Sequence, residues 1–258
     1  MSYSLDALVN DFALRSFRET ADKDYIAARI AYRARLIQPF LWSSLHCLEK
    51  YAKCVLILNR IKSEKGHTVL RQLELLKQVG KFEAKIDKAA LDFIVRLEEH
   101  GAALRYYEMS YFNQAYDIMR LDNAVSQIRR YCRVMDYAIE LEGTRKDMLA
   151  SEIGRNIWAA DNKKRDTCIS GGYLEAVLAK KDHPARAGLV YKNLFFGTSH
   201  RKAVLMRSDW EAGNSPFFLH PEIVDEVAKY VYIPGPVAEG ARQAARKAAA
   251  KSALKMKS

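Results

Sequence analysis

The stretch PFLWSSLHCLEKYAKCV, residues 39–55, decides the fold class of this chain. Its proline suits the first turn of a helix, because the N–H that proline lacks would have no partner there. Apolar residues then recur at steps of three and four, which places them on one face of an α-helix. They are Leu41, Leu45, Leu48, Ala52 and Val55. The stretch therefore predicts an amphipathic helix whose apolar face packs against other helices.

Similar helices are expected on both sides of this one. Residues 67–79 repeat the apolar spacing, and two further helices are expected at about 87–100 and 121–140. A bundle of four or more helices is the simplest arrangement that buries their apolar faces together. We therefore expect residues 1–160 to form a mainly α, up-and-down helical bundle.

The pattern of the sequence changes after residue 160. Apolar runs on both sides of the turn GTSHRK, residues 197–202, predict a β-hairpin, and prolines bound a short helix near residues 222–232. Residues 161–237 are therefore expected to form a small α/β-hairpin extension. Residues 238–258 form a basic tail rich in alanine and lysine, which has high helix propensity but no apolar stripe, so we expect it to be flexible.

The composition is that of a globular protein with a basic excess. Hydrophobic residues make up 49% and charged residues 28%, and the net charge of +11 favours nucleic acid or acidic partners. More than half of this excess lies after residue 160. No stretch approaches the roughly 18 uninterrupted apolar residues of a membrane helix, and the first residues do not resemble a signal peptide. We therefore expect a cytoplasmic protein with no membrane contact.

Cysteines and histidines do not follow the spacing of a metal site. The four cysteines include no CxxC pair, and Cys47 and Cys54 would lie two helical turns apart, too far to bridge. His46 adjoins Cys47 but has no further ligands at the spacing that a structural zinc site requires. Phosphate-binding loops of the GxGxxG and GxxxxGK[ST] types are missing as well. We expect reduced thiols and neither a metal nor another cofactor.

Three short motifs follow one another along the first half of the chain. They are the EKxxK motif at Glu49, Lys50 and Lys53, the Gly-His motif at Gly66 and His67, and the Arg-Tyr motif at Arg105 and Tyr106. A leucine-rich helix is expected directly after the Gly-His motif. With this order and spacing, roughly residues 22–107 resemble the HEPN domain family, and most closely the subclass that partners minimal nucleotidyltransferases.

The HEPN resemblance implies a helical bundle that tends to form homodimers, with a nucleotidyltransferase-like protein as one partner. In the catalytic branches it also implies a metal-independent endoribonuclease, built on an Arg-x4-6-His pair. The histidine would take the proton of the ribose 2′-hydroxyl, while the arginine would stabilise the charge on the phosphorane. The question is therefore whether this chain contains such a pair.

Two Arg/His pairs come near the catalytic spacing. Arg60 and His67 have six residues between them, but Ile61 follows the arginine where active branches usually carry a polar residue. Arg96 and His100 have three residues between them, one too few, although this spacing puts both on one helix face. Arginine and histidine at such distances are common in a basic chain, so we interpret neither pair as an established catalytic site.

Two groups of residues are candidates for nucleic-acid binding. His200, Arg201, Lys202 and Arg207 would form a basic patch at the predicted hairpin turn, where they could contact phosphates. A solvated turn would explain the same residues. The aromatic side chains between residues 106 and 116 could stack bases, although such clusters are more often core or dimer contacts.

The leading interpretation is a non-catalytic HEPN-like module that binds nucleic acid or a protein partner. The alternative is a metal-independent endoribonuclease, toxin-like or defence-related, that uses one of the two Arg/His pairs. A purely structural interaction protein with an incidental basic tail is a third hypothesis. An arginine and a histidine that converge in a groove would favour the enzyme, whereas positive charge on one face would favour the binding module.

Overall fold

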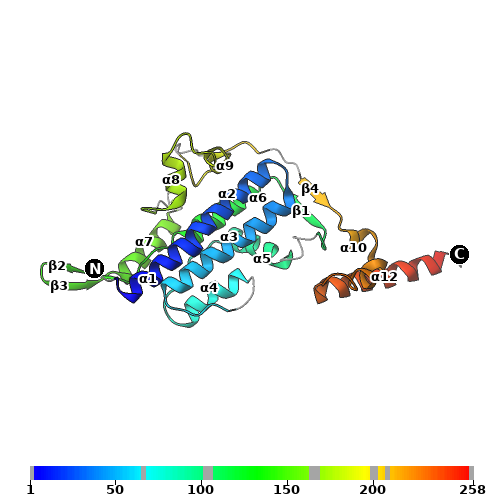
Figure 1. Cartoon of the computed structure of the whole chain (residues 1–258), viewed down its shortest axis with the longest axis horizontal. Helices are drawn as coiled ribbons and strands as arrows, with labels where there is room; N and C mark the ends of the chain where they lie inside the picture. The colour runs from blue at the N-terminus through cyan, green and yellow to red at the C-terminus, as the bar shows by residue number, and fades with distance from the viewer. Residues whose placement is uncertain are drawn as a thin grey trace. The chain divides into compact units, whose positions relative to one another are not determined.

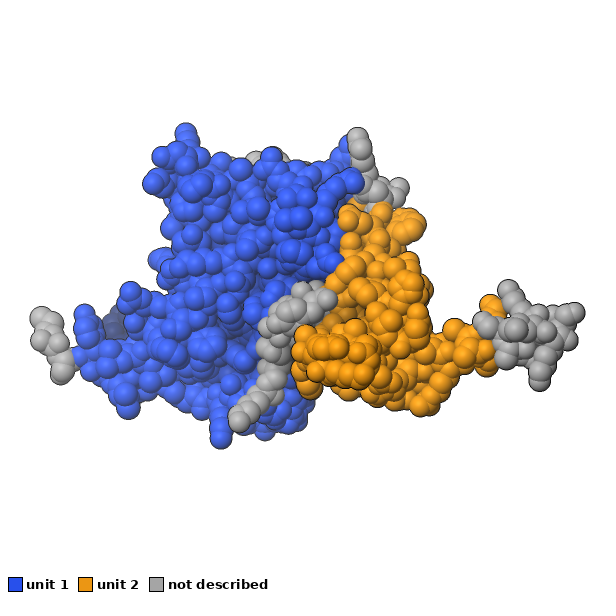
Figure 2. Space-filling view, turned by 45° about the vertical axis from the view of Figure 1, so that its right-hand side comes forward, with its two compact units in different colours: residues 1–99, 116–206 blue, residues 100–115, 207–258 orange. Residues whose placement is uncertain are grey.

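The computed structural model places helices over most of the chain (Figure 1). It describes residues 3–64, 68–100, 107–162, 169–197, 203–206 and 210–255. These residues fall into two compact units, shown in different colours in Figure 2. Unit 1 comprises residues 1–99 and 116–206, and unit 2 comprises residues 100–115 and 207–258.

Unit 1 is a helical bundle, so the predicted mainly α fold is confirmed. Its longer helices are α2 (Thr20–Arg33), α3 (Ile37–Leu58), α5 (Lys88–His100), α6 (Asp117–Arg129) and α7 (Leu149–Asp161). Its shorter helices are α1 (Leu5–Phe12), α4 (Val69–Gln78), α8 (Tyr173–Ala179) and α9 (Arg186–Val190). A π-helical segment, η1 (Ala13–Glu19), joins α1 to α2. None of the helices that the structure describes is long and apolar enough to cross a membrane.

Helix α3 lies at the centre of unit 1, in agreement with the pattern of residues 39–55. It packs against α2, α4, α6 and η1. Pro39 lies in its first turn, and all five residues of the predicted apolar stripe are buried. Cys47 and Cys54 on this helix, and Cys132, are free buried thiols, as expected. Because its apolar stripe is buried and several neighbouring elements pack against it, α3 organises the bundle.

A short hairpin interrupts the first half, which we expected to be helical throughout. Strands β2 (Ala138–Leu141) and β3 (Thr144–Asp147) pair antiparallel. The helix expected at 121–140 therefore ends at residue 129. The two turn residues, Glu142 and Gly143, have φ values of 50° and 74°. Positive φ at both positions is the requirement of a two-residue hairpin turn of type I′, and helical periodicity does not reveal it.

The β-hairpin predicted around residues 197–202 is not formed by the described residues on either side of that turn. Residues 186–190 form α9 instead, and residues 203–206 belong to no strand. The side chain of Asn193 explains part of this difference, because its Oδ1 accepts the backbone N–H groups of Phe195 and Phe196, both at 2.9 Å. These bonds hold a turn rather than an extended strand.

Unit 2 consists of a two-stranded sheet and short helices followed by one long helix. Its elements are β1 (Tyr111–Gln114), β4 (Trp210–Gly213), α10 (Pro216–Leu219), η3 (Pro221–Ile223), α11 (Val224–Val227) and α12 (Gly235–Lys255). The strands pair antiparallel, with Phe112 opposite Ala212. This pairing places residues 111–114 and residues 210–213 in the same compact unit. The predicted domain boundaries at residues 160 and 237 stay a prediction.

The basic tail is helical as far as the structure describes it, to residue 255, and its flexibility stays a prediction. Helix α12 continues as far as Lys255. Ala238 and Ala241 on its first turns are buried in a small apolar cluster with Phe217 and Val224. Alanine has the highest helix propensity, and this packing anchors one end of the helix. The sequence pattern showed the propensity but not the packing partner.

Candidate functional site

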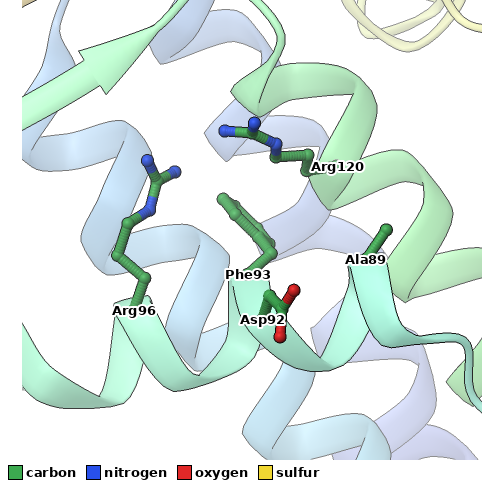
Figure 3. A pocket seen from close by; sticks show the side chains of 5 residues that line it. All are labelled: Ala89, Asp92, Phe93, Arg96 and Arg120. Atoms are coloured by element: carbon green, nitrogen blue, oxygen red, sulfur yellow. The ribbon is translucent and has the colours of Figure 1, made fainter.

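An open cavity of about 290 Å³ lies in unit 1, beside helices α5 and α6 (Figure 3). It is lined by Ala89, Asp92, Phe93, Arg96 and Arg120. The first four are spaced at steps of three and four along α5, so they share one face of that helix. Arg120 comes from α6. We call this cavity the arginine pocket.

A buried carboxylate fixes the two arginines of the pocket. Asp117 in the first turn of α6 is fully buried, and its Oδ1 lies 2.6 Å from Nη2 of Arg96. Nη1 of Arg120 donates to the same oxygen at 2.8 Å. These three side chains together carry two positive charges and one negative charge. A carboxylate at the start of a helix is also favoured by the helix dipole, so Asp117 is well placed to hold both guanidinium groups.

The floor of the arginine pocket is the ring of Phe93, which is 2% exposed. The guanidinium group of Arg96 lies 5.3 Å from the centre of this ring, a cation–π contact. Figure 3 shows the side chains of Arg96 and Arg120 reaching the space above the ring of Phe93 from two different helices. Asp92 at the rim forms an exposed ion pair with Lys88 at 2.6 Å. The pocket therefore presents two oriented guanidinium groups, which suit an anion such as a phosphate group.

The core of unit 1 contains two reciprocal ion pairs that were not predicted from the sequence. Nε of Arg129 donates to Oδ1 of Asp22 at 2.7 Å, and Nη2 donates to Oδ2 at 2.9 Å. Arg29 pairs with Asp122 through one oxygen, since its Nη1 donates to Oδ1 of Asp122. All four side chains are at most 1% exposed. Each of the helices α2 and α6 thus carries an Asp-x6-Arg motif. The signal was present in the sequence, because this spacing puts both charges on one face of a helix that is expected to be buried.

The pair formed by Asp22 and Arg129 extends to two further helices. The hydroxyl of Tyr51 on α3 donates to Asp22 at 2.6 Å. Nη1 and Nη2 of Arg129 donate to the two carboxylate oxygens of Glu175 on α8, both at 2.8 Å. Helices α2, α3, α6 and α8 are therefore joined by one hydrogen-bonded network. Because these groups are buried and satisfy one another, we assign them a structural role.

Glu175 makes the stability of this network sensitive to acid. Burial alone would raise its pKa, but the hydrogen bonds and the charge of Arg129 outweigh burial and hold the pKa of Glu175 below its usual value. A lowered pKa stabilises the fold above the usual pKa of glutamate, and this stability is lost as the pH falls through the lowered value. Wild type should therefore lose more stability than Glu175→Gln between about pH 6 and about pH 3.

Urea unfolding at a series of pH values measures this difference. Glu83→Gln, which changes an exposed glutamate of unit 1, is the matched control and should keep the wild-type pH profile. Identical profiles for wild type and Glu175→Gln would show that the Glu175 carboxylate does not contribute in this way.

The comparison with known families supports the helical architecture. A model of the HEPN domain matches residues 14–139. The chain carries a HEPN domain. The match extends beyond the residues whose motifs suggested the resemblance and runs from η1 to β2. No curated protein and no solved structure gives a significant match.

The EKxxK motif of the HEPN domain ties helix α3 to its neighbour. Nζ of Lys50 donates to Oδ2 of Asp24 on α2 at 2.5 Å. Nζ of Lys53 donates to Oε1 of Glu49 one turn away at 2.6 Å. Both lysines therefore form ion pairs within the helical bundle. The other motif residues, Gly66, His67, Arg105 and Tyr106, lie outside the described residues.

Arg60 holds the N-terminal helix of the HEPN protein. It has a φ of 59° just after α3, and its Nη2 donates to Oδ1 of Asp6 at 2.9 Å. Its Nη1 donates to Oδ1 of Asn10, also at 2.9 Å. Asp6 and Asn10 both lie on α1. The guanidinium group thus joins the end of α3 to α1, while the predicted partner His67 lies outside the described residues.

Of the second predicted pair, Arg96 and His100, the structure describes the side chain of Arg96. Arg96 lines the arginine pocket, and His100 ends α5 one turn farther on. The side chain of His100 lies outside what the structure describes. The predicted nucleic-acid patch lies outside it as well, namely His200, Arg201, Lys202 and Arg207. Among the predicted site residues that the structure describes, Arg96 lines the arginine pocket. Arg120 lines it as well, and Asp117, which pairs with both arginines, was not predicted as part of a site.

Proposed function

We propose that this HEPN protein is a non-catalytic module that binds RNA, acting as a homodimer. The arginine pocket is the observation that supports this function. Its two guanidinium groups are already oriented by Asp117 and Phe93, so little conformational freedom is lost when they meet a phosphate. Guanidinium groups match the geometry of phosphate oxygens, and the net positive charge of the chain attracts the RNA backbone.

The hydrogen bonds and ion pairs of the two candidate arginines, Arg60 and Arg96, favour a binding function over a catalytic one. The guanidinium group of Arg60 donates to side chains of α1, so it supports the fold. Arg96 is paired with Asp117, which compensates part of the charge that a phosphorane would need. Each arginine therefore has a partner within the protein. Such an arrangement suits a ground-state contact with phosphate better than a group reserved for a transition state.

The endoribonuclease alternative keeps one specific observation in its favour. Arg96 opens to a cavity, and His100 follows it on the same helix at the i,i+4 spacing. A histidine in this position could act as a general base on a 2′-hydroxyl of an RNA that occupies the arginine pocket. Cleavage of RNA in EDTA, abolished by His100→Ala, is the outcome that would favour this alternative.

Removing both guanidinium groups of the pocket should weaken RNA binding. We expect the double variant Arg96→Gln/Arg120→Gln to bind about 30-fold less tightly, as for two charged contacts worth about 1 kcal/mol each. The slope of binding against salt should also fall by about 1 to 2. Fluorescence anisotropy with a labelled RNA in EDTA measures both quantities, and gel analysis of the same samples reports cleavage.

Arg71→Gln is the matched control for this experiment. Arg71 is an exposed arginine of unit 1 that pairs with Glu64 on the surface, so its loss should change the affinity by less than about twofold. Equal losses in the double variant and the control would mean that only total charge matters. If wild type binds no RNA, the nucleic-acid function is wrong and a protein partner becomes the leading hypothesis.

A further inference from the structure

The two-stranded sheet of unit 2 has an unusual distribution of side chains. On one face, Asn113 is buried, and Tyr111 packs against the ring of Tyr107. Gly213 lies opposite Tyr111, and a Cβ atom there would come within 2.5 Å of the Tyr111 ring. This face is thus closed by tight packing, and a larger residue at position 213 would require the two tyrosine side chains to move. Alternation along the strands then places Phe112 and Trp210 on the opposite face.

Phe112 and Trp210 form an exposed aromatic pair. Their rings lie 5.8 Å apart at an angle of 36°. Phe112 is 44% exposed and Trp210 is 68% exposed. Ala212, directly opposite Phe112, is small and also exposed, so no bulky side chain of its strand rises beside the rings. The outer face of the sheet is therefore an accessible aromatic surface, which we call the aromatic platform.

The size of the aromatic platform argues against a protein partner. Two aromatic side chains offer about 150–250 Å² each, whereas a stable protein interface buries roughly 1,200 Å² or more in total. A nucleic-acid base is a flat ring that fits a surface of this size. Stacking on aromatic side chains is also the usual way in which proteins hold unpaired bases.

The long helix of the same unit supplies the complementary charge. No acidic residue follows Glu239 in the sequence, while α12 carries exposed cations at Arg246, Lys247 and Lys251. From Ala241, which is buried, to Lys251 the helix extends for about 15 Å. This length equals the spacing of a few phosphates along a single strand. Unit 2 therefore combines surfaces for bases and for phosphates.

We propose that the aromatic platform of Phe112 and Trp210 stacks unpaired bases of single-stranded RNA, whose backbone is held by the cations of α12. This proposal rests on the RNA-binding function proposed above and names a second site for it. Because paired bases are already stacked within a duplex, the platform discriminates in favour of single strands. Binding is tolerant of sequence, since every base has a flat face.

Substitution of Trp210 tests the platform. Trp210→Leu keeps an apolar side chain on the strand but removes the aromatic face. It should weaken binding of a labelled single-stranded RNA by roughly 5- to 150-fold, and Phe112→Leu should act in the same direction. Trp210→Phe keeps a ring and should retain most of the affinity. A blunt duplex of the same length should bind all of these variants within about twofold of wild type.

Tyr232→Ala is the control, since Tyr232 is an aromatic side chain of unit 2 that is 85% exposed and lies outside the sheet. It should leave both affinities unchanged. Wild-type affinity of Trp210→Leu for the single strand would overturn the platform, as would an equal loss for single strand and duplex. If wild type binds neither the single strand nor the duplex, the proposed RNA-binding function is wrong. This outcome can be told apart from the two that would contradict the aromatic platform alone.

The phosphate contacts are tested by a separate variant. The triple substitution Arg246→Gln, Lys247→Gln and Lys251→Gln should lower the salt slope of single-strand binding by about 2, because each phosphate contact contributes roughly 0.7. The preference for single strand over duplex should persist, since the aromatic pair is intact. An unchanged slope would remove α12 from the proposed site.

Discussion

Replacing Asp22 by alanine should lower the free energy of unfolding by about 3–5 kcal/mol, the range seen when one partner of a buried ion pair is removed. Asp22 is fully buried and accepts two hydrogen bonds from Arg129 and one from Tyr51. Without it, Arg129 keeps only Glu175 as an ionic partner of this network, and the Tyr51 hydroxyl loses its acceptor. Urea unfolding followed by circular dichroism measures the change.

The matched control for Asp22→Ala is Asp24→Ala on the same helix. Asp24 pairs with Lys50, and its side chain is 28% exposed. Solvent screens such a pair, so its loss should cost about 0–1 kcal/mol. Similar losses for Asp22→Ala and Asp24→Ala would contradict the importance that we assign to the buried network. A normal unfolding slope in both variants would show that the comparison concerns the same folded state.

Leu48→Ala should lower the free energy of unfolding by about 2–5 kcal/mol. Leu48 belongs to the apolar stripe of α3 and is fully buried at the centre of unit 1. Truncation removes apolar surface from the core and leaves a cavity, because the helices packed around α3 can relax only in part. The same urea experiment measures the effect, and near-ultraviolet circular dichroism reports whether the core remains ordered.

Leu36→Ala is the control for this core substitution. Leu36 precedes α3 and is 54% exposed, so its truncation should change the stability by no more than about 0.5 kcal/mol. If both leucine variants lose the same stability, α3 does not have the central position that its burial indicates. If only Leu48→Ala is destabilised, burial of the predicted apolar stripe makes a large contribution to the free energy of unfolding.

The sequence by itself determined the helices α3, α4 and α5, whereas the helix expected at 121–140 ends at residue 129. Apolar residues at steps of three and four in α3 are a local pattern, and burial follows from it whatever the neighbouring helices are. The order of short motifs was enough to indicate the HEPN family, which the match over residues 14–139 confirms. The nucleotidyltransferase-partner subclass, the homodimer and the patch around His200 stay predictions.

The tertiary structure decided how distant residues meet. Asp22 and Arg129 pair across two helices, and Arg96 and Arg120 converge on Asp117. Strand β4 pairs with β1 although residues 116–206 of unit 1 lie between them in the sequence. Periodicity reports which face of an element is apolar, but it does not report which element covers that face. The pocket and the aromatic platform therefore became visible only in three dimensions, because each is made by side chains from separate segments of the chain.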